Sequence, residues 1–420
     1  MTLTVRILIA LVFGLICGIA IAEWGGAWDR TIVDVVQPIG KAWLGGLQMP
    51  LIPLIFALLV TGIAQAATTA RNNGLAARAI GLFAILLVGA ASVAALAGPL
   101  LLTLWPVPEG AVGALAGAGP VSEVPDVRPS AEWLLGFIPV NPLKSAADGQ
   151  VVAIVLFALI FGFAVTRIAA DRRAQLVGFF QALADALLVV VNWVLWLAPV
   201  GVFALALVAG ARSGLATAGA LLHYILFIVA LCLLVTLLVY PMTVLLGRIG
   251  VGRFARAAFP AQAIAFSTQS SIASLPAMIQ ASDGALAVRE TSRSIVLPLA
   301  ISLFRITSPP ANLGVALYVA AMNGVDLGAT QLVLGVLVAA VVSLAAVGLP
   351  SQITFFTTTG PICLAMGVPV EALPLLLAVE TVPDIFRTVG NVTADMGVAR
   401  ILDQRRVASC RAFVRARGAR

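Results

Sequence analysis

The chain has 420 residues, of which 61% are hydrophobic and 10% charged, and this apolar content, with a mean hydropathy of +1.09, predicts a membrane protein rather than a soluble domain. The net charge of +7 does not indicate nucleic-acid binding, because the basic residues lie at segment ends and in the tail without interleaved aromatic residues. The four cysteines lie far apart without metal-ligand spacing, so the sequence implies neither a disulfide framework nor a zinc site.

Apolar stretches between charged joints predict a series of membrane helices in the first part of the chain. A helix needs about 20 apolar residues to cross the hydrocarbon core of a bilayer. The first stretch is not followed by a small-residue cleavage site, so we expect a retained helix rather than a secretory signal. The predicted helices lie near residues 3–22, 44–67, 75–105, 151–166, 183–210 and 219–247.

Two later segments are interrupted at their middles. Segment 257–283 contains a cluster of serines and threonines, and segment 330–366 contains Gly348 and Pro350. An interruption leaves backbone polar groups unpaired, which a membrane tolerates only where they face protein or a watery cavity. Paired broken segments are typical of a transporter's binding site. We therefore predict two re-entrant helical hairpins near these ranges.

The distribution of basic residues predicts the topology. With two re-entrant hairpins and eight crossings, one side of the membrane receives most of the arginines, including the Arg-rich tail from Arg400. The opposite side receives few basic residues and an acidic loop within the Pro- and Gly-rich interval 106–150, which we expect to be an external crossover. The basic side is predicted to be cytoplasmic, so both termini are expected there.

The last apolar segment carries ionisable residues, which are costly at membrane depth and therefore indicate function. Spacings of three and four residues place a polar set on or near one face of one helix that also contains Glu380. A guanidinium matches a carboxylate, and a carboxylate can receive an ammonium group, so the set predicts binding of an acidic amino acid. The alternative is that Asp384 and Arg387 form a purely structural pair. The set consists of Asp384, Arg387, Thr388, Asn391 and Asp395.

Two other places hold polar residues beside interrupted helix. Ser270 and Ser271 lie at the interruption of the first hairpin, where helix N-terminal amides and hydroxyls can hold a substrate carboxylate. Arg305 precedes Pro309 and Pro310, which prevent continuous helical hydrogen bonding in the penultimate crossing. A buried arginine beside unwound backbone needs an acidic partner.

From about residue 4 to residue 403 the chain resembles the dicarboxylate and amino acid:cation symporter family, which includes the glutamate transporters. The strongest motif is in the last helix, where an Asp, an Arg-Thr pair, an Asn-Val pair and a final Asp match at the same spacing. The other matching stretches are FIPVNPLKSAADGQ at 137–150, LAPVGVFAL at 197–205, the serine hairpin at 266–276 and AAVGLP at 345–350.

This resemblance implies roles for single residues. Asp384 would bind a substrate amino group and Arg387 its side-chain carboxylate, with Thr388 assisting. Ser271 and Asn391 would bind the α-carboxylate. The remaining residues assigned to the substrate site are Ser270, Ser308, Gly348 and Pro350.

The resemblance also implies an all-α polytopic fold of eight transmembrane helices and two re-entrant hairpins, assembled as a homotrimer that works by an elevator movement. Residues 1–73 would form scaffold, 74–106 a transport-domain helix, and 107–216 scaffold with the external crossover. Residues 217–403 would form the transport domain with the hairpins near 257–283 and 330–366, and 404–420 a basic cytoplasmic tail.

One motif departs from the family. Members usually have Asn-Met-Asp-Gly-Thr in the penultimate crossing, where this chain has Phe304, Arg305, Ile306, Thr307 and Ser308. The Asn and Asp lost there are ones that the family uses around sodium ions, so the usual multi-sodium coupling is not expected. We hypothesise that Arg305 is a tethered cation that compensates Asp395 in place of a bound sodium, because an unpaired buried carboxylate is costly. The candidate cation-site residues are Arg305, Asn391 and Asp395.

The sequence therefore predicts a secondary transporter of an aspartate- or glutamate-like anion in a bacterial cytoplasmic membrane, with sodium or a proton as the coupling ion and no cofactor. Its partners would be the small anionic substrate, the lipid bilayer and two further copies of the chain, without nucleic acid. A C4-dicarboxylate transporter is the alternative, for which Asp384 would have little purpose. A passive channel and a non-transporting sensor also remain open. An intramembrane enzyme is disfavoured, because no Ser-His pair or metal cluster is present.

Overall fold

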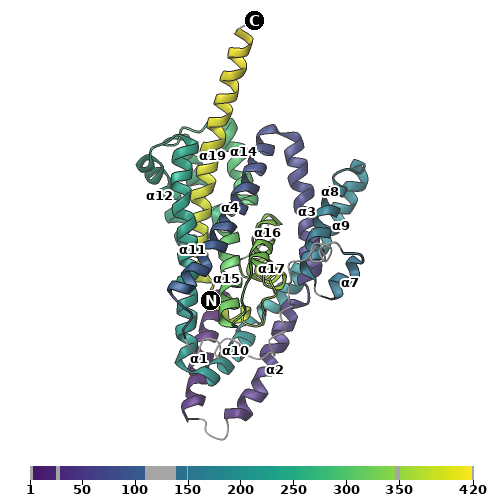
Figure 1. Ribbon diagram of the computed structural model, residues 1–420, viewed down its shortest axis with the longest axis vertical. Coiled ribbons are helices and arrows are strands. Elements are labelled where there is room, and N and C mark those ends of the chain that lie inside the picture. Colours follow the sequence, from purple (N-terminus) through teal and green to yellow (C-terminus); the bar gives the residue numbers. More distant parts are fainter. Residues whose placement is uncertain (1–2, 25–28, 109–138, 149, 346–350, 419–420) are drawn as a thin grey trace.

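In a computed structural model, the structure describes residues 3–24, 29–108, 139–148, 150–345 and 351–418 (Figure 1). All regular elements of this described part are α-helices, which confirms the predicted all-α class. Six helical stretches of the described residues are long and apolar enough to cross a membrane. The predicted count of eight crossings stays a prediction.

The first two helices pack on a later one, α10 (Ala198–Ser213). α1 (Leu3–Trp24) is followed by α2 (Asp29–Gln48) and α3 (Leu51–Asn72). The prediction of one helix at 44–67 was wrong, because a turn at residues 49–50 divides the stretch. α1 packs along α10, and a Cβ on Gly18 would lie 2.2 Å from the carbonyl oxygen of Leu207. The absence of a side chain at Gly18 thus permits a close backbone approach.

The next part of the chain begins with a long helix. α4 (Gly74–Leu104) is 31 residues long, and the Asn73 side chain caps its start by accepting hydrogen bonds from two backbone N–H groups. α7 (Pro142–Ala147) leads into α8 (Val151–Val165), which packs on α3. The prediction of one helix at 183–210 was wrong, because α9 (Ala170–Trp196) ends within this range and Leu197 separates it from α10.

The first predicted hairpin is confirmed. α11 (Leu215–Gly247) precedes α12 (Val251–Thr268) and α13 (Ser271–Asp283), and these last two helices pack on each other. Gln269 at the turn has a left-handed φ of 53°. The Ser270 hydroxyl oxygen then caps α13 by accepting from the N–H of Ala273 at 3.2 Å. The serine-rich sequence therefore ends one helix and starts the next.

The penultimate segment is interrupted as predicted, and a second helical pair follows it. α14 (Glu290–Leu303) ends before the non-helical residues 304–307, and α15 (Ser308–Met322) begins with two prolines inside its first turn. α16 (Ala329–Ala345) and α17 (Ser351–Ala365) pack on each other in the range of the second predicted hairpin. The expected tip residues Gly348 and Pro350 lie outside the described residues.

The last segment is two helices rather than one. α18 (Leu373–Val379) is separated by Glu380 from α19 (Thr381–Gly418), so the expectation that Glu380 shares a helix with the other polar residues was wrong. Figure 1 shows α19 passing through the bundle beside α11, α12 and α14 and extending beyond it. The residues from Asp384 to Asp395 all lie on α19, as predicted.

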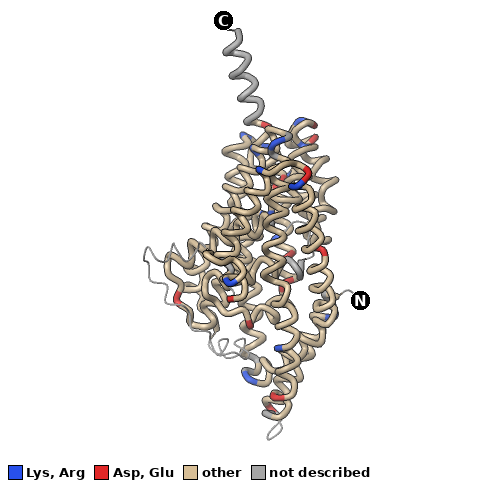
Figure 2. Tube along the Cα trace, turned by 90° about the vertical axis from the view of Figure 1, so that its right-hand side faces the viewer, with Lys and Arg blue, Asp and Glu red and all other residues tan. Residues whose placement is uncertain are grey.

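Charged residues gather where α19 leaves the bundle (Figure 2). There Arg289 forms an ion pair with Asp403 at 2.9 Å, and Arg400 donates to the carbonyl of Gly247 at 3.0 Å. The starts of α12 and α14 and the end of α11 therefore meet α19 at one end of the molecule. This clustering agrees with the basic side that the sequence predicts.

Candidate functional site

The non-helical link between α14 and α15 lies directly against α19. The Thr307 N–H donates to Oδ1 of Asn391 at 3.1 Å, and its hydroxyl lies 2.7 Å from both that oxygen and the carbonyl oxygen of Arg387. A Cβ on Gly390 would lie 2.4 Å from Cγ2 of Thr307, so the glycine lets the link approach this closely. These contacts hold the interrupted backbone at the depth of the polar face of α19.

Arg387 is buried and already faces an acidic residue. Its Nη2 lies 2.6 Å from Oε1 of Glu380, and the two side chains are only 7% and 3% exposed. The Tyr224 hydroxyl on α11 donates to the other oxygen, Oε2, at 2.8 Å. A buried arginine therefore sits in an acid–tyrosine cradle built by the α18–α19 junction and α11.

One edge of the Arg387 guanidinium is left without hydrogen bonds. The 2.6 Å contact with Glu380 is an ion pair but does not have hydrogen-bond geometry. Nε and Nη2 of Arg387 accordingly make no hydrogen bond within the described part of the chain. These two atoms form the fork that binds a carboxylate through two parallel hydrogen bonds. A planar anion can therefore bind at this edge where it displaces Oε1 of Glu380 from Nη2.

The neighbouring polar residues of α19 are also inside the bundle. Thr388 is 6% exposed, and its hydroxyl donates to the carbonyl of Asp384 one turn earlier at 2.9 Å. Asp384 is half-buried and interacts electrostatically with Arg387. Asn391 is 6% exposed and uses Oδ1 to hold Thr307, whereas its Nδ2 donates to none of the residues that the structure describes. An amide donor and a carboxylate thus flank the arginine.

A second buried charge lies deeper along α19. Asp395 is fully buried, and neither of its carboxylate oxygens has a hydrogen-bond partner among the described residues. Its charge interacts with that of Arg305 in the α14–α15 link, and Arg305 also interacts with Asp384. The structure thus brings the predicted tethered cation into electrostatic range of the predicted carboxylate.

The residues flanking Arg305 are apolar and buried. Phe304 is fully buried and its ring stacks on that of Phe83 of α4, with centroids 4.7 Å apart. Ile306 is 4% exposed. Neither side chain has an oxygen that could bind a metal ion. The cationic charge of this link is that of Arg305.

The first hairpin lies beside the same helix. Gln262 of α12 donates to the hydroxyl of Thr393 at 2.7 Å, and Phe266 makes an edge contact with Phe386. The turn residues Ser270 and Ser271 follow, with Ser270 holding its own helix start. Ser308 is buried at the start of α15, and its contact with a substrate stays a prediction. Gly348 and Pro350 are not described.

Comparison with known proteins gives the family. Residues 3–405 match the sequence pattern of the sodium:dicarboxylate symporter family. The chain belongs to this symporter family. The resemblance read from the last helix is therefore confirmed, and the match covers nearly the whole chain.

Relatives within the symporter family cover the chain at low identity. The proton/glutamate-aspartate symporter of Escherichia coli is 26% identical, covering 94% of this chain and 92% of its own length. The proton/sodium-glutamate symport protein of Bacillus subtilis is 27% identical, with 96% and 92% covered. The C4-dicarboxylate transport protein 1 of a Pseudomonas aeruginosa strain is 25% identical, with 94% and 87% covered.

Sequence reasoning missed three contacts of this symporter's site. Glu380 was recognised as a membrane ionisable residue but not as the partner of Arg387, although the two stand seven residues apart, two helical turns. Tyr224 lies in an apolar run whose pattern does not show what its hydroxyl binds. Thr307 was known only as part of an altered motif, and its role in joining the link to α19 comes from the structure.

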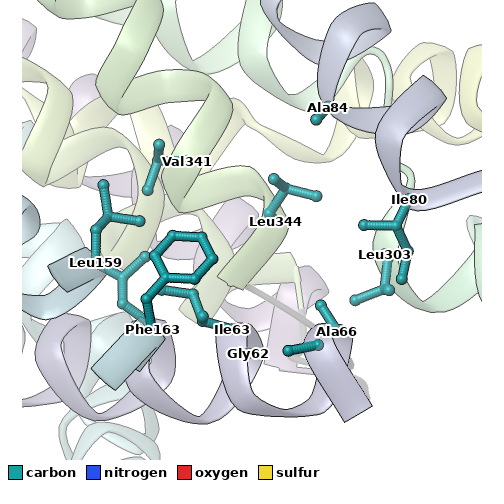
Figure 3. A pocket seen from close by; sticks show the side chains of 12 residues that line it. Gly62, Ile63, Ala66, Ile80, Ala84, Leu159, Phe163, Leu303, Val341 and Leu344 are labelled. Carbon is teal, nitrogen blue, oxygen red and sulfur yellow. The ribbon is translucent and has the colours of Figure 1, made fainter. Parts of the chain in front are cut away.

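An apolar cavity is lined by none of these charged residues (Figure 3). Its volume is about 350 Å³, and it is lined by α3 and α8 and by α4, α14 and α16. It contains none of the predicted site residues. Its lining includes Ile63, Phe163, Ile80, Leu303, Val341 and Leu344. The cavity is thus an apolar space between helices rather than a site for an anion.

Proposed function

We propose that this symporter moves an acidic amino acid of the aspartate or glutamate type across a bacterial cytoplasmic membrane. The observation that carries the proposal is the buried Arg387, whose Nε–Nη2 edge makes no hydrogen bond within the described residues. A guanidinium fork in a dry site binds a carboxylate strongly, because charge-assisted hydrogen bonds gain strength away from water.

The surroundings of Arg387 favour an amino acid over a simple dicarboxylate. Asp384 lies three residues before Arg387 on α19 and can receive a substrate ammonium group. The Nδ2 of Asn391, together with Ser271 at the start of α13, would hold the α-carboxylate, and Thr388 would assist. Ser270, Ser308, Gly348 and Pro350 would complete the enclosure. A C4-dicarboxylate would leave the carboxylate of Asp384 facing another anion, which is unfavourable.

We further propose that transport follows an elevator movement in a homotrimer with cytoplasmic termini. α4, α11, α12, α13, α14 and α19 share one hydrophobic cluster, which supports their movement as one body. The apolar cavity lies where α3 and α8, assigned to the scaffold, meet α4 and α16, assigned to the transport domain. An apolar boundary opposes sliding less than one crossed by hydrogen bonds or ion pairs.

We propose that Arg305 takes the place of a coupling ion at Asp395. Asp395 has no hydrogen-bond partner among the described residues, and Arg305 supplies an opposite charge that cannot dissociate. The amide oxygen of Asn391 already accepts from Thr307, and Phe304 and Ile306 offer no oxygen. A carboxylate of this kind needs a cation, and here the chain provides it.

A ligand-stabilisation screen of the purified protein tests the substrate class. A ligand that binds only the folded protein raises the free energy of unfolding by about 2.7 kcal/mol at a hundred times its Kd. Aspartate and glutamate are expected to raise the Tm, and succinate much less. Arg387→Lys keeps a positive charge beside Glu380 but loses the fork, so the affinity is expected to fall by about tenfold or more.

Arg212→Lys provides the matched control, because Arg212 is exposed on α10 and donates a hydrogen bond to the side chain of Gln37, away from the site. It should leave the ligand response unchanged. Stabilisation by succinate without aspartate would favour the C4-dicarboxylate alternative. No response to any acidic ligand would contradict the proposal and favour a channel or a sensor.

A further inference from the structure

The buried pair of Arg387 and Glu380 creates a conflict when a substrate anion arrives. The free Nε–Nη2 edge of Arg387 includes Nη2, the atom that lies 2.6 Å from Oε1 of Glu380. A substrate carboxylate that takes this edge competes with Glu380 for the same donor. Binding therefore weakens the ion pair that neutralises a glutamate whose side chain is 3% exposed.

The charges around the pair make this conflict severe. Within the described residues, Arg305 and Arg387 face the carboxylates of Glu380, Asp384 and Asp395, so with all groups ionised the site has one excess negative charge. An acidic amino acid adds another negative charge. A buried carboxylate without a cation is strongly disfavoured and takes up a proton instead.

Glu380 is the carboxylate expected to take up the proton, because of the groups that face it. On α19 these are Arg387 and Asp384, and on α11 they are Tyr224 and Cys232. Asp384 would be occupied by the substrate ammonium group, and Tyr224 is a neutral donor. Among the described residues of α1, α10 and α17, which also pack against α18, no ionisable group interacts with Glu380. His223, next to Tyr224, contacts Tyr318 instead.

We propose that Glu380 binds the coupled proton of this transporter. The inference rests on the proposed function and names its coupling ion. When the substrate carboxylate takes Arg387, one proton from the water on that side joins the Glu380 carboxylate, and no covalent bond of the protein changes otherwise. When the substrate leaves on the other side, the proton leaves with it and Glu380 pairs with Arg387 again. The empty carrier then returns with the pair neutral.

This exchange couples the proton and the substrate in both directions. By linkage, a proton that binds with the substrate makes substrate binding stronger at lower pH, and substrate binding makes the protein take up a proton. In the pH range where each bound substrate brings one full proton, the Kd of the substrate is expected to rise about tenfold for each unit by which the pH is raised. A substrate that left the Arg387–Glu380 pair intact would show neither effect.

Proton uptake on binding is the direct test. Aspartate is added to the purified full-length protein in weakly buffered solution with a pH-indicator dye, and binding is followed by Tm in the same samples. The expected result is about one proton taken up per bound aspartate. Binding without proton uptake would overturn the inference while leaving the proposed function intact, whereas absence of binding would overturn both.

Glu380→Gln assigns the proton to this residue. Glutamine keeps the size of the side chain and cannot take up the proton, so the proton uptake per bound aspartate, measured at saturating aspartate, is expected to be lost. Glu290→Gln is the matched control, because Glu290 is exposed at the start of α14, and it should take up the same proton as the unmodified protein. Uptake that persists in Glu380→Gln would overturn the assignment.

An infrared measurement on the unmodified protein covers the case in which Glu380→Gln does not fold. The spectrum with aspartate minus the spectrum without it is expected to show a new C=O band of a protonated carboxyl group. Tyr224→Phe removes the donor to Oε2, so the band should shift in that variant. A spectrum without such a band, or a band that Tyr224→Phe leaves in place, would contradict the proposal.

Discussion

Two arginines inside the helical bundle, the buried Arg387 and the half-buried Arg305, define this transporter at the scale of single residues. Arg387 faces Glu380 at 2.6 Å, and Arg305 interacts with the fully buried Asp395. Arg387 is proposed to exchange its acidic partner for the substrate, and Arg305 is proposed to substitute permanently for a metal ion. The surroundings differ, because Nε and Nη2 of Arg387 make no hydrogen bond within the described residues, whereas the residues before and after Arg305 are buried and apolar.

Replacing Arg305 with Met is predicted to create a requirement for sodium. The variant leaves the fully buried carboxylate of Asp395 without the opposite charge of Arg305, and a buried charge without a compensating cation is costly. A sodium ion can enter the vacated space, so both the Tm and aspartate binding should depend on sodium in the variant. The Tm and Kd are measured in sodium and in choline salts of equal strength.

Arg212→Met, on the exposed surface of α10, is the matched control and should show no sodium response. The unmodified protein is likewise expected to bind aspartate equally in the two salts. A steep sodium dependence of the unmodified protein would contradict the tethered-cation account, whatever the variant does.

Much of this residue-scale picture could be predicted from the sequence, and the limits are physical. The spacing of Asp384, Arg387, Thr388, Asn391 and Asp395 predicted a shared helix, because the period of a helix fixes which positions are neighbours. Tyr224 is more than 150 positions before Glu380, and helix period carries no information about contacts between distant helices. The same limit explains why the tie between Thr307 and Asn391 was missed.

At the scale of elements, interrupted helices position the polar groups. The interruption at 304–307 and the turn at Gln269 followed from prolines and serines in the sequence. The breaks at Leu197 and Glu380 were missed, because each is a single residue between two helices and hydropathy does not register it. Pro199, in the first turn of α10, was the available signal of the first break.

The close packing of α1 on α10 supports a prediction about stability. In Gly18→Ala the new methyl group would meet the carbonyl of Leu207 at 2.2 Å, a backbone atom that cannot rotate away. Forcing extra volume into a packed interface costs about 1–3 kcal/mol, so the Tm should fall. Gly89→Ala in α4 meets nothing within 4 Å and is the control.

Gly89→Ala should raise the free energy of unfolding slightly, since alanine is favoured over glycine within a helix by about 0.5–1 kcal/mol. Thermal unfolding of both variants in the same detergent gives the comparison. Equal Tm values for the two variants would mean that α1 and α10 do not pack as the structure shows.

At the scale of the whole molecule, membership of the sodium:dicarboxylate symporter family and the arginine buried beside Glu380 point to the same activity. The polar site lies on α19, α11 and the α14–α15 link, whereas the cavity between α3, α8, α4 and α16 is apolar. This separation fits a carrier in which a charged substrate stays enclosed in one domain that moves along an apolar interface. The movement itself, the trimer and the orientation in the membrane stay predictions.

Counterflow of labelled aspartate tests the central claim, that Arg387 holds an acidic amino acid during transport. Proteoliposomes loaded with unlabelled aspartate are placed in a trace of labelled aspartate. The account predicts saturable uptake of the label, competition by glutamate, and loss of most uptake in Arg387→Lys but not in Arg212→Lys. Uptake that rises without saturation, or that is the same in Arg387→Lys as in the unmodified protein, would contradict it.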